Sequence, residues 1–313
     1  MNILFYLEGN RWWGGNEVLA GRQAARLRAE GHEVVFLHRP DPEAFAQAGR
    51  IVVHKCPAAG VLALFPPEKT DVWLHDYEAV CPRWHGYPPF RWSCNRAAGW
   101  WPCLFCAPVC RDWRGALKRL SGQRRLLDLL RRMRRLVVIS HFMKGRLLAN
   151  GLPADRIAVE PPELPEGVPE PLPPGTENID LLYAGQLLRG KGVQVLLRAL
   201  ARLDPSHTLD VVGRGPHEGH LRALARRLGL GGRVRWRGWV ADARSWMVPA
   251  ACVVLPSVWP EPYGLVAAEA VALGRPVVAS AVGGIPEACG GNAVLVPPGD
   301  AAALARALEE VRP

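Results

Sequence analysis

The chain has 313 residues, of which 49% are hydrophobic, and carries a formal net charge of +10 at pH 7. This length and apolar content can form two globular domains of about 150 residues each. No apolar run reaches the roughly 18 to 20 residues that cross a bilayer, and the opening NILFYL is too short for a signal peptide. We therefore expect a cytoplasmic protein, whose basic charge is compatible with phosphate-bearing ligands, an anionic membrane or nucleic acid.

The first half alternates between apolar runs and helical patterns, which favours a parallel sheet covered by helices. The predicted strands are residues 2–7, 32–38, 51–53, 72–75, 136–139 and 157–160, and the predicted helices include 16–30 and 140–149. Gly14 and Gly15 stand directly before the first helix, where two glycines let the backbone approach a ligand closely. The same pair is also compatible with an ordinary turn.

A segment rich in cysteine, tryptophan and proline follows the fourth strand, and we treat residues 76–116 as an insertion. Irregular segments of such length inside a compact domain usually carry a function. Four cysteines, Cys94, Cys103, Cys106 and Cys110, could surround a structural zinc ion or an iron–sulfur cluster, because thiolates bind both. The alternative is a set of reduced thiols that pack beside the tryptophans.

Residues 114–135 show the pattern of a basic amphipathic helix. One stripe holds the apolar side chains of Leu126, Leu129, Leu130 and Met133, and arginines surround it. Such a helix either packs its apolar stripe into a core or lies on an anionic membrane. The second alternative predicts a peripheral contact with the inner membrane face through residues 117–136.

A proline-rich segment at residues 161–176 has no hydrophobic periodicity and predicts a linker between two domains, residues 1–165 and 175–313. Beyond it, the alternation of strands and helices returns, so both halves are predicted to be Rossmann-like units that bind ligands at the carboxyl ends of their strands. The predicted strands here are residues 179–184, 208–212, 233–237, 252–255, 276–279 and 293–296, before a final helix at 301–311.

The stretch PSVWPEPYGLVAAEAVALGRPVVAS at residues 256–280 combines a strand end, a loop, a helix and another strand. Glu261 lies on the loop and Glu269 lies inside the helix, so both carboxylates can face one crevice. The backbone N–H groups of Gly264 and Leu265 stand at the helix N-terminus, which is a ready anion site. This combination suits a sugar joined to a nucleotide diphosphate, and the alternative is an ordinary crossover with two solvated glutamates.

Together these residues resemble the family-4 retaining glycosyltransferases, also described as glycosyl transferases group 1. The resemblance rests on YAGQLLRGKG, VVGRGP, EPYGLVAAE and GGIPE in the second half, and on HD at residues 75–76 and SHFMKGRLLANGLPADRIAV in the first. It implies the α/β fold called GT-B, two Rossmann-like domains whose parallel sheets face a central cleft. It also implies transfer of a hexosyl group from a nucleotide-diphosphate sugar to a glycan or lipid-linked acceptor, as in polysaccharide biosynthesis.

The resemblance implies roles for individual residues. Glu261 would contact hydroxyls of the donor sugar and Glu269 the ribose, while the backbone at Gly264 and Leu265 would hold the phosphates. Lys191 would neutralise the leaving diphosphate, whose charge grows as the glycosidic bond breaks.

The same resemblance extends the donor site to Gly14, Gly15, Gln186, Arg189 and Gly213. The family often has an arginine where this chain has Gln186, so either Arg189 supplies that charge or the diphosphate is held less strongly. His75 would reach the donor sugar from the first domain, and the alternative for it is a structural histidine.

The chain contains no Asp-x-Asp pair, so we expect transfer that needs no metal and no other cofactor. One rival interpretation is a nucleotide-sugar epimerase or hydrolase of the same fold. Another is a nucleic-acid or membrane-binding module built on the arginine-rich helix and the cysteine cluster. That module leaves Glu261, Glu269 and Lys191 unexplained, and we expect no nucleic acid partner.

Overall fold

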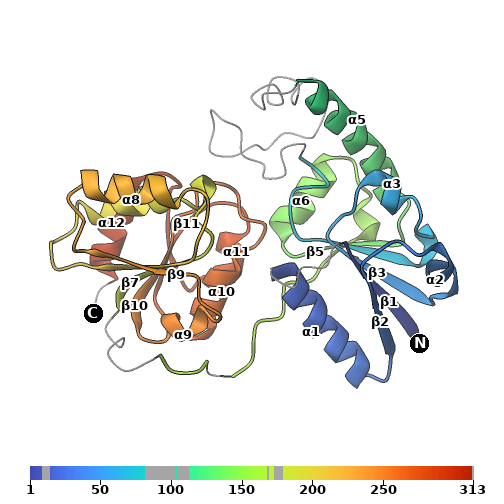
Figure 1. The fold of residues 1–313 in the computed structure, drawn as a ribbon, viewed down its shortest axis with the longest axis horizontal. Coiled ribbons are helices and arrows are strands. Elements are labelled where there is room, and N and C mark those ends of the chain that lie inside the picture. Colours follow the sequence, from blue (N-terminus) through green and yellow to red (C-terminus); the bar gives the residue numbers. More distant parts are fainter. Residues whose placement is uncertain (9–14, 82–102, 104–112, 168, 173–178, 312–313) are drawn as a thin grey trace. The chain divides into compact units, whose positions relative to one another are not determined.

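The computed structural model describes residues 1–8, 15–81, 103, 113–167, 169–172 and 179–311. The chain divides into two compact units, Met1–Glu163 and Leu164–Pro313, and each unit has its own parallel sheet (Figure 1). The division falls within the proline-rich segment 161–176.

Unit 1 is built on a six-stranded sheet with the order β2-β1-β3-β4-β5-β6. Its strands are β1 (Asn2–Leu7), β2 (Glu33–Leu37), β3 (Arg50–His54), β4 (Thr70–Leu74), β5 (Arg135–Val138) and β6 (Ile157–Val159). Its α-helices are α1 (Gly15–Ala29), α2 (Pro42–Gln47), α3 (Ala59–Leu62), α5 (Trp113–Leu130) and α6 (His141–Ala149). Side chains of β1 alternate between the two faces, so Phe5 joins the core under α1 while Tyr6 joins the core on the opposite face.

Unit 2 is built on a second six-stranded parallel sheet, with the order β12-β11-β10-β7-β8-β9. Its strands are β7 (Ile179–Ala184), β8 (Leu209–Val212), β9 (Val234–Gly238), β10 (Ala250–Leu255), β11 (Val277–Ser280) and β12 (Val294–Val296). Its α-helices are α7 (Val193–Leu200), α8 (Glu218–Arg227), α9 (Arg244–Met247), α10 (Leu265–Ala272), α11 (Ile285–Cys289) and α12 (Ala301–Glu310). Every strand predicted from the sequence is present, and no strand end differs by more than two residues.

The arginine-rich helix α5 is shorter than predicted. It ends at Leu130, and Arg135 already belongs to β5, where the sheet pairs with β4 and β6. Arg131 is the first residue after the helix, and its guanidinium donates to the carbonyl oxygens of Asn150 and Gly151 at 3.1 Å each. The prediction of a helix through Arg135 was therefore wrong. The backbone of Arg135 pairs with β4 in the sheet, although the helical spacing of apolar residues extends to this region.

The apolar stripe of α5 faces the core of unit 1. Leu126, Leu130 and Met133 are all buried in the cluster that also contains Tyr6 and Leu62. Of the two alternatives for this helix, the core-packed stripe is the one that the structure shows. No helix in the described ranges is long and apolar enough to cross a bilayer.

Candidate functional site

The loops that follow β7 and β10 in unit 2 are packed directly on one another. Gly192 has φ 76°, and a Cβ atom at this position would lie 1.7 Å from the carbonyl oxygen of Pro256. The carbonyl oxygen of Gly190 accepts hydrogen bonds from the backbone N–H groups of Val258 at 2.8 Å and Trp259 at 3.1 Å. These contacts fix the loop that carries Lys191 against the loop that carries Glu261.

Lys191 and Glu261 form the central ion pair of these loops. The Lys191 ammonium donates to both carboxylate oxygens of Glu261, at 2.8 Å to Oε1 and 2.9 Å to Oε2. Oε1 also accepts from the Ser257 hydroxyl at 2.7 Å and from the Trp259 indole N–H at 2.8 Å. Sequence reasoning selected Lys191 and Glu261 separately but missed their direct contact and the two additional donors.

The pair joins a buried carboxylate to a partly exposed ammonium. Burial by itself would raise the pKa of Glu261, but the charge of Lys191 and the hydrogen bonds from Lys191, Ser257 and Trp259 lower it below its ordinary value. The Glu261 carboxylate is therefore ionised at neutral pH. The Lys191 side chain is 25% exposed and its ammonium lies 5.3 Å from the centre of the Trp259 ring, so a fixed positive charge reaches the surface.

The helix α10 presents its N-terminus directly after the Glu261 loop. Gly264 precedes the helix with φ 115°, and its carbonyl accepts the first helical hydrogen bonds from Ala267 and Ala268. The N–H groups of Leu265 and the residue after it have no partner within the helix and lie at the positive end of its dipole. The structure thus places Gly264 and Leu265 at a helix N-terminus, and their role toward a phosphate stays a prediction.

Four further residues predicted for the donor, Gln186, Arg189, Gly213 and Glu269, also lie in unit 2. Gly213 has φ 130°, and a Cβ here would lie 1.9 Å from the carbonyl oxygen of Gly185, so this glycine lets the loops after β8 and β7 approach. Gln186 and Arg189 are exposed, and Glu269 is half-buried in α10. The roles of these side chains toward a ligand stay predictions.

His75 lies in unit 1, directly after β4, and is only 6% exposed. Its Nε2 is 3.0 Å from Nδ1 of His54, and Nε2 of His54 is 2.8 Å from the amide oxygen of Gln23. Burial lowers the pKa of His75 to about 4, and burial followed by the neighbouring His75 lowers the pKa of His54 well below its ordinary value. Sequence reasoning missed Gln23 and His54, although His54 also stands at the end of a strand and could have been found by that signal.

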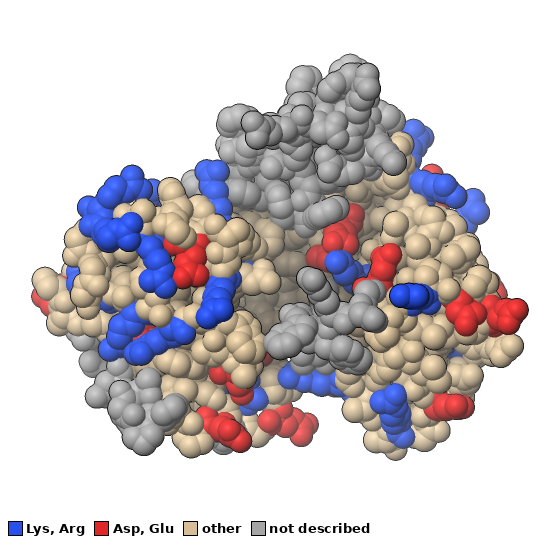
Figure 2. Space-filling view, in the orientation of Figure 1, with Lys and Arg blue, Asp and Glu red and all other residues tan. Residues whose placement is uncertain are grey.

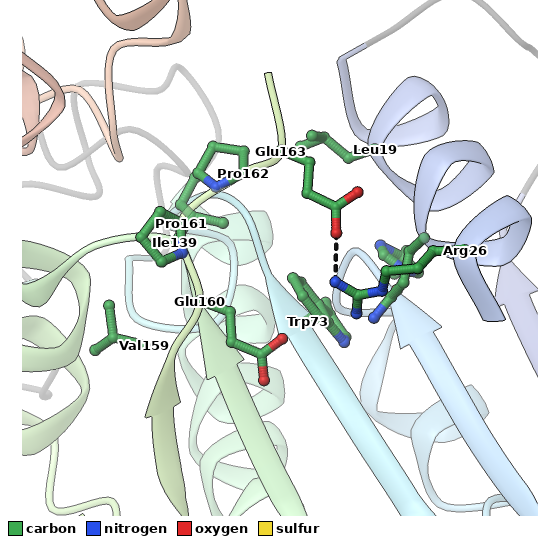
Figure 3. Close-up of a pocket in the computed structure, with 11 residues that line it drawn as sticks. Leu19, Arg26, Trp73, Ile139, Val159, Glu160, Pro161, Pro162 and Glu163 are labelled. Atoms are coloured by element: carbon green, nitrogen blue, oxygen red, sulfur yellow. Dashed lines mark hydrogen bonds and ion pairs between the residues drawn. The ribbon is translucent and has the colours of Figure 1, made fainter. Parts of the chain in front are cut away.

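A cavity of about 270 Å³ opens beside His54 within unit 1 (Figure 3). Its walls include Gln23, His54 and Trp73, and Glu160 and Glu163 stand at the start of the linker. Glu163 forms an ion pair with Arg26 of α1 at 2.5 Å, which ties the linker to that helix. Sequence reasoning did not predict this cavity, because its walls come from α1, β3, β4 and β6 and from the segments that follow β5 and β6, which are far apart in the chain.

Several predicted residues lie outside the described part of the chain. They are Gly14, Cys94, Cys106 and Cys110. Gly15 is the first residue of α1, and Cys103 is half-buried. Within the ranges that the structure describes, no group of three or more potential metal ligands is found, so the cysteine cluster stays a prediction.

Comparison with known proteins gives likenesses to a family model, to curated relatives and to a solved structure. Residues 178–312 match the family model described as Glycosyl transferases group 1. The match supports this family for the chain. In sequence, the chain is 38% identical over 134 residues to the lipopolysaccharide core biosynthesis glycosyltransferase LpsE of Rhizobium meliloti, which covers 42% of this chain and 38% of LpsE. It is also 38% identical over 145 residues to glycogen synthase of Mycobacterium tuberculosis, which covers 44% of this chain and 35% of that enzyme.

The matched region spans little more than a third of the length of these two relatives. The structural likeness is broader. HepE of Anabaena, solved in complex with UDP-glucose, superimposes with a TM-score of 0.69 at 21% identity and covers 99% of this chain and 89% of HepE. A likeness of this kind establishes the fold, and the fold of the chain is GT-B. The fold that the sequence predicts is confirmed in its two Rossmann-like units.

Proposed function

We propose that the protein is a retaining glycosyltransferase that moves a hexosyl group from a nucleotide-diphosphate sugar to a glycan or lipid-linked acceptor. The observation that carries this proposal is the ion pair between the buried Glu261 carboxylate and the partly exposed Lys191 ammonium, in the loops before α10 of the unit that matches the glycosyltransferase family.

The chemistry of the site fits the departure of a nucleoside diphosphate. Breaking the glycosidic bond leaves negative charge on the diphosphate, and a fixed cation together with helix N–H groups stabilises that charge. Lys191 supplies the cation, and Leu265 begins the helix that supplies the N–H groups. We further propose that this protein charge takes the place of a metal ion, so that transfer proceeds without one.

For the donor, we propose a UDP-sugar. Solved structures of HepE, whose fold this chain shares, contain UDP, UDP and glucose, or UDP-glucose. For the acceptor, we propose a saccharide or a lipid-linked saccharide, since one relative in sequence is named for lipopolysaccharide core biosynthesis.

Ligand binding and turnover test the proposal in two steps. The melting temperature is measured with UDP, GDP, ADP and the corresponding nucleotide-diphosphate glucoses. We expect UDP or UDP-glucose to raise it most. Product anomers are then assigned by NMR in the presence and absence of EDTA, and we expect retention in both. Complete turnover of the donor without any acceptor would instead favour a nucleotide-sugar hydrolase or epimerase.

Membrane contact and metal binding also belong to the proposals. Arg124, Arg125 and Arg132 of the α5 region are exposed, and co-sedimentation with anionic vesicles at low salt tests whether they hold the protein at the cytoplasmic face of a membrane. Figure 2 shows basic side chains over both units with acidic ones among them. For the cysteine cluster, a metal content near zero after anaerobic purification would exclude zinc and iron–sulfur alike.

A further inference from the structure

Trp259 contacts both charged groups of the candidate site in unit 2. Its indole N–H donates to Oε1 of Glu261 at 2.8 Å, and the Lys191 ammonium lies over its ring, 5.3 Å from the ring centre. The backbone N–H of Trp259 also donates to the carbonyl oxygen of Gly190 at 3.1 Å. One residue therefore contacts both members of the ion pair and the loop that carries the lysine.

The indole N–H orders the Glu261 carboxylate. Oε1 accepts hydrogen bonds from the side chains of Lys191, Ser257 and Trp259, and Oε2 accepts from Lys191. Hydrogen bonds to an ionised carboxylate are among the strong ones, and an indole N–H can only donate. The bond from Trp259 therefore opposes rotation of the carboxylate group. Because Lys191 bonds to both carboxylate oxygens, the orientation of that group also sets the position of the ammonium.

The indole ring acts on the ammonium directly. The face of a tryptophan ring carries partial negative charge and attracts a cation that lies over it. The Lys191 ammonium is thus held by two separate groups, the carboxylate of Glu261 and the ring of Trp259. The Lys191 side chain is still 25% exposed, so these contacts leave part of it open to a ligand.

Gly190 provides the space in which the ring lies. A Cβ atom at residue 190 would be 3.0 Å from Cγ and 3.1 Å from Cδ2 of Trp259. It would also be 3.2 Å from Cβ of Trp259, so rotating the ring alone would not relieve the contact. Since interiors are closely packed, a larger residue here has to displace the tryptophan. The residue before Lys191 and the ring over Lys191 therefore depend on each other.

We propose that Trp259 is a positioning residue of the transfer reaction, which holds Glu261 and Lys191 in the arrangement that presents the ammonium to the leaving diphosphate. The role in transfer rests on the proposed function, whereas the placement of Lys191 by Trp259 does not.

NMR of the full chain with labelled lysine tests the placement without any ligand. Protons over the face of an aromatic ring resonate upfield, so the ε-methylene protons of Lys191 are expected upfield of those of the other lysines. The signal is assigned by its loss in Lys191→Met. Trp259→Leu is expected to remove the upfield shift, and Gly190→Ala is expected to reduce it. A wild-type Lys191 signal among those of the other lysines would overturn the proposal, even if the variants do not fold.

Steady-state kinetics test the role in transfer. Trp259→Phe keeps a ring and removes the N–H, whereas Trp259→Leu removes both. We expect kcat to fall about 10-fold in Trp259→Phe and further in Trp259→Leu, with a smaller change in the KM for the donor. The charge on the diphosphate grows in the transition state, so a misplaced cation affects kcat most. The control is Trp246→Phe, whose ring contacts Arg237 in the same unit and should leave kcat unchanged. A raised KM with unchanged kcat would contradict the proposal.

A double-mutant cycle shows whether Trp259 acts through Lys191. If it does, adding Trp259→Leu to Lys191→Met should lower kcat by less than about 2-fold, because the cation is already gone. Losses that multiply would mean that Trp259 acts apart from Lys191, and they would refute the positioning role. If the folded wild-type protein transfers no sugar from any donor, the proposed function fails, while the NMR spectrum still decides whether Trp259 places Lys191.

Discussion

At the scale of single residues, Lys191 depends on Glu261 for its orientation. The Glu261 carboxylate, buried and ionised, receives four hydrogen bonds, two of them from the Lys191 ammonium. The Lys191 ammonium is already held by the carboxylate and the Trp259 ring before a diphosphate binds, so little side-chain entropy is lost on binding. Under the proposed function, Glu261 would act both through sugar hydroxyls, as the sequence suggested, and through the placement of Lys191.

Replacing Lys191 with methionine is expected to lower the rate of transfer at least about 10-fold, because the leaving diphosphate loses its fixed cation. The free energy of unfolding is expected to fall by about 1–3 kcal/mol, since the buried Glu261 carboxylate loses its charged donor. Steady-state kinetics and thermal unfolding measure the two effects. Arg198→Met, at an exposed position of α7, is the control, and an equal loss of activity in both variants would mean that general charge is responsible.

The buried histidines predict how the stability of unit 1 depends on pH. Burial holds the pKa of His75 at about 4, against about 6.5 in an unfolded chain, so the unfolded state binds the extra proton between these values. The free energy of unfolding is therefore highest above pH 6.5, where His75 is neutral in both states, and it decreases as the pH falls toward 4. At pH 5 we expect a loss of about 2 kcal/mol.

Thermal unfolding of the wild type and of His75→Gln between pH 4.5 and 8 measures this contribution. The variant, which lacks the titrating ring, is expected to lose less stability between pH 6.5 and 5. Parallel curves for the two proteins in that interval would show that His75 is not responsible.

At the scale of elements, a buried carboxylate ties β8 to the edge strand β9. Asp210 is fully buried and accepts hydrogen bonds from Arg235 at 3.0 Å and Arg237 at 2.6 Å. Asp71 of β4 is a fully buried carboxylate of unit 1 that also has two arginine partners, Arg50 of β3 at 2.9 Å and Arg134 before β5. All four arginine side chains are partly exposed, whereas the side chains of both aspartates are fully buried.

This asymmetry makes the cost of a substitution depend on which partner is removed. The double variant Arg235→Met with Arg237→Met leaves the Asp210 carboxylate buried and unpaired, and we expect a loss of about 3–5 kcal/mol. Adding Asp210→Leu should recover most of that loss, because the uncompensated charge is gone. Thermal unfolding compares the double and triple variants, and a triple variant no more stable than the double would contradict this account.

The helix α5 shows how far periodicity predicts an element. The spacing of Leu126 and Leu130 predicted a buried face correctly, since helical geometry places residues four apart on one side. Met133 is buried in the same cluster although it lies beyond the end of the helix. The end of the helix was predicted too late, because the choice between helix and strand at Arg135 depends on hydrogen bonds from β4 and β6. Those strands are distant in sequence, so the local spacing of apolar residues does not predict the pairing.

At the scale of the whole molecule, the two features proposed to bind the diphosphate, Lys191 and the N-terminus of α10, both belong to unit 2. The family match covers the same unit, at residues 178–312. We therefore expect UDP to protect unit 2 from hydrogen exchange in the full chain, most strongly at residues 186–192 and 256–265, where the loops after β7 and β10 meet.

Hydrogen-exchange mass spectrometry with and without UDP measures this protection by peptide. The aspartate-centred contact between β8 and β9 provides an internal control, since its peptides should change little. Protection confined to unit 1 would place the nucleotide elsewhere and would contradict the proposed site.

The sequence by itself determined the alternation of strands and helices, the division near the proline-rich segment and the loop residues Lys191 and Glu261. These features are local, because each follows from periodicity, from glycine and proline, or from a short motif. Only the tertiary structure decided that Lys191 bonds to Glu261 and that His75 bonds to His54. These partners are 70 and 21 residues apart, and they meet because parallel strands bring their carboxyl ends to one edge of a sheet.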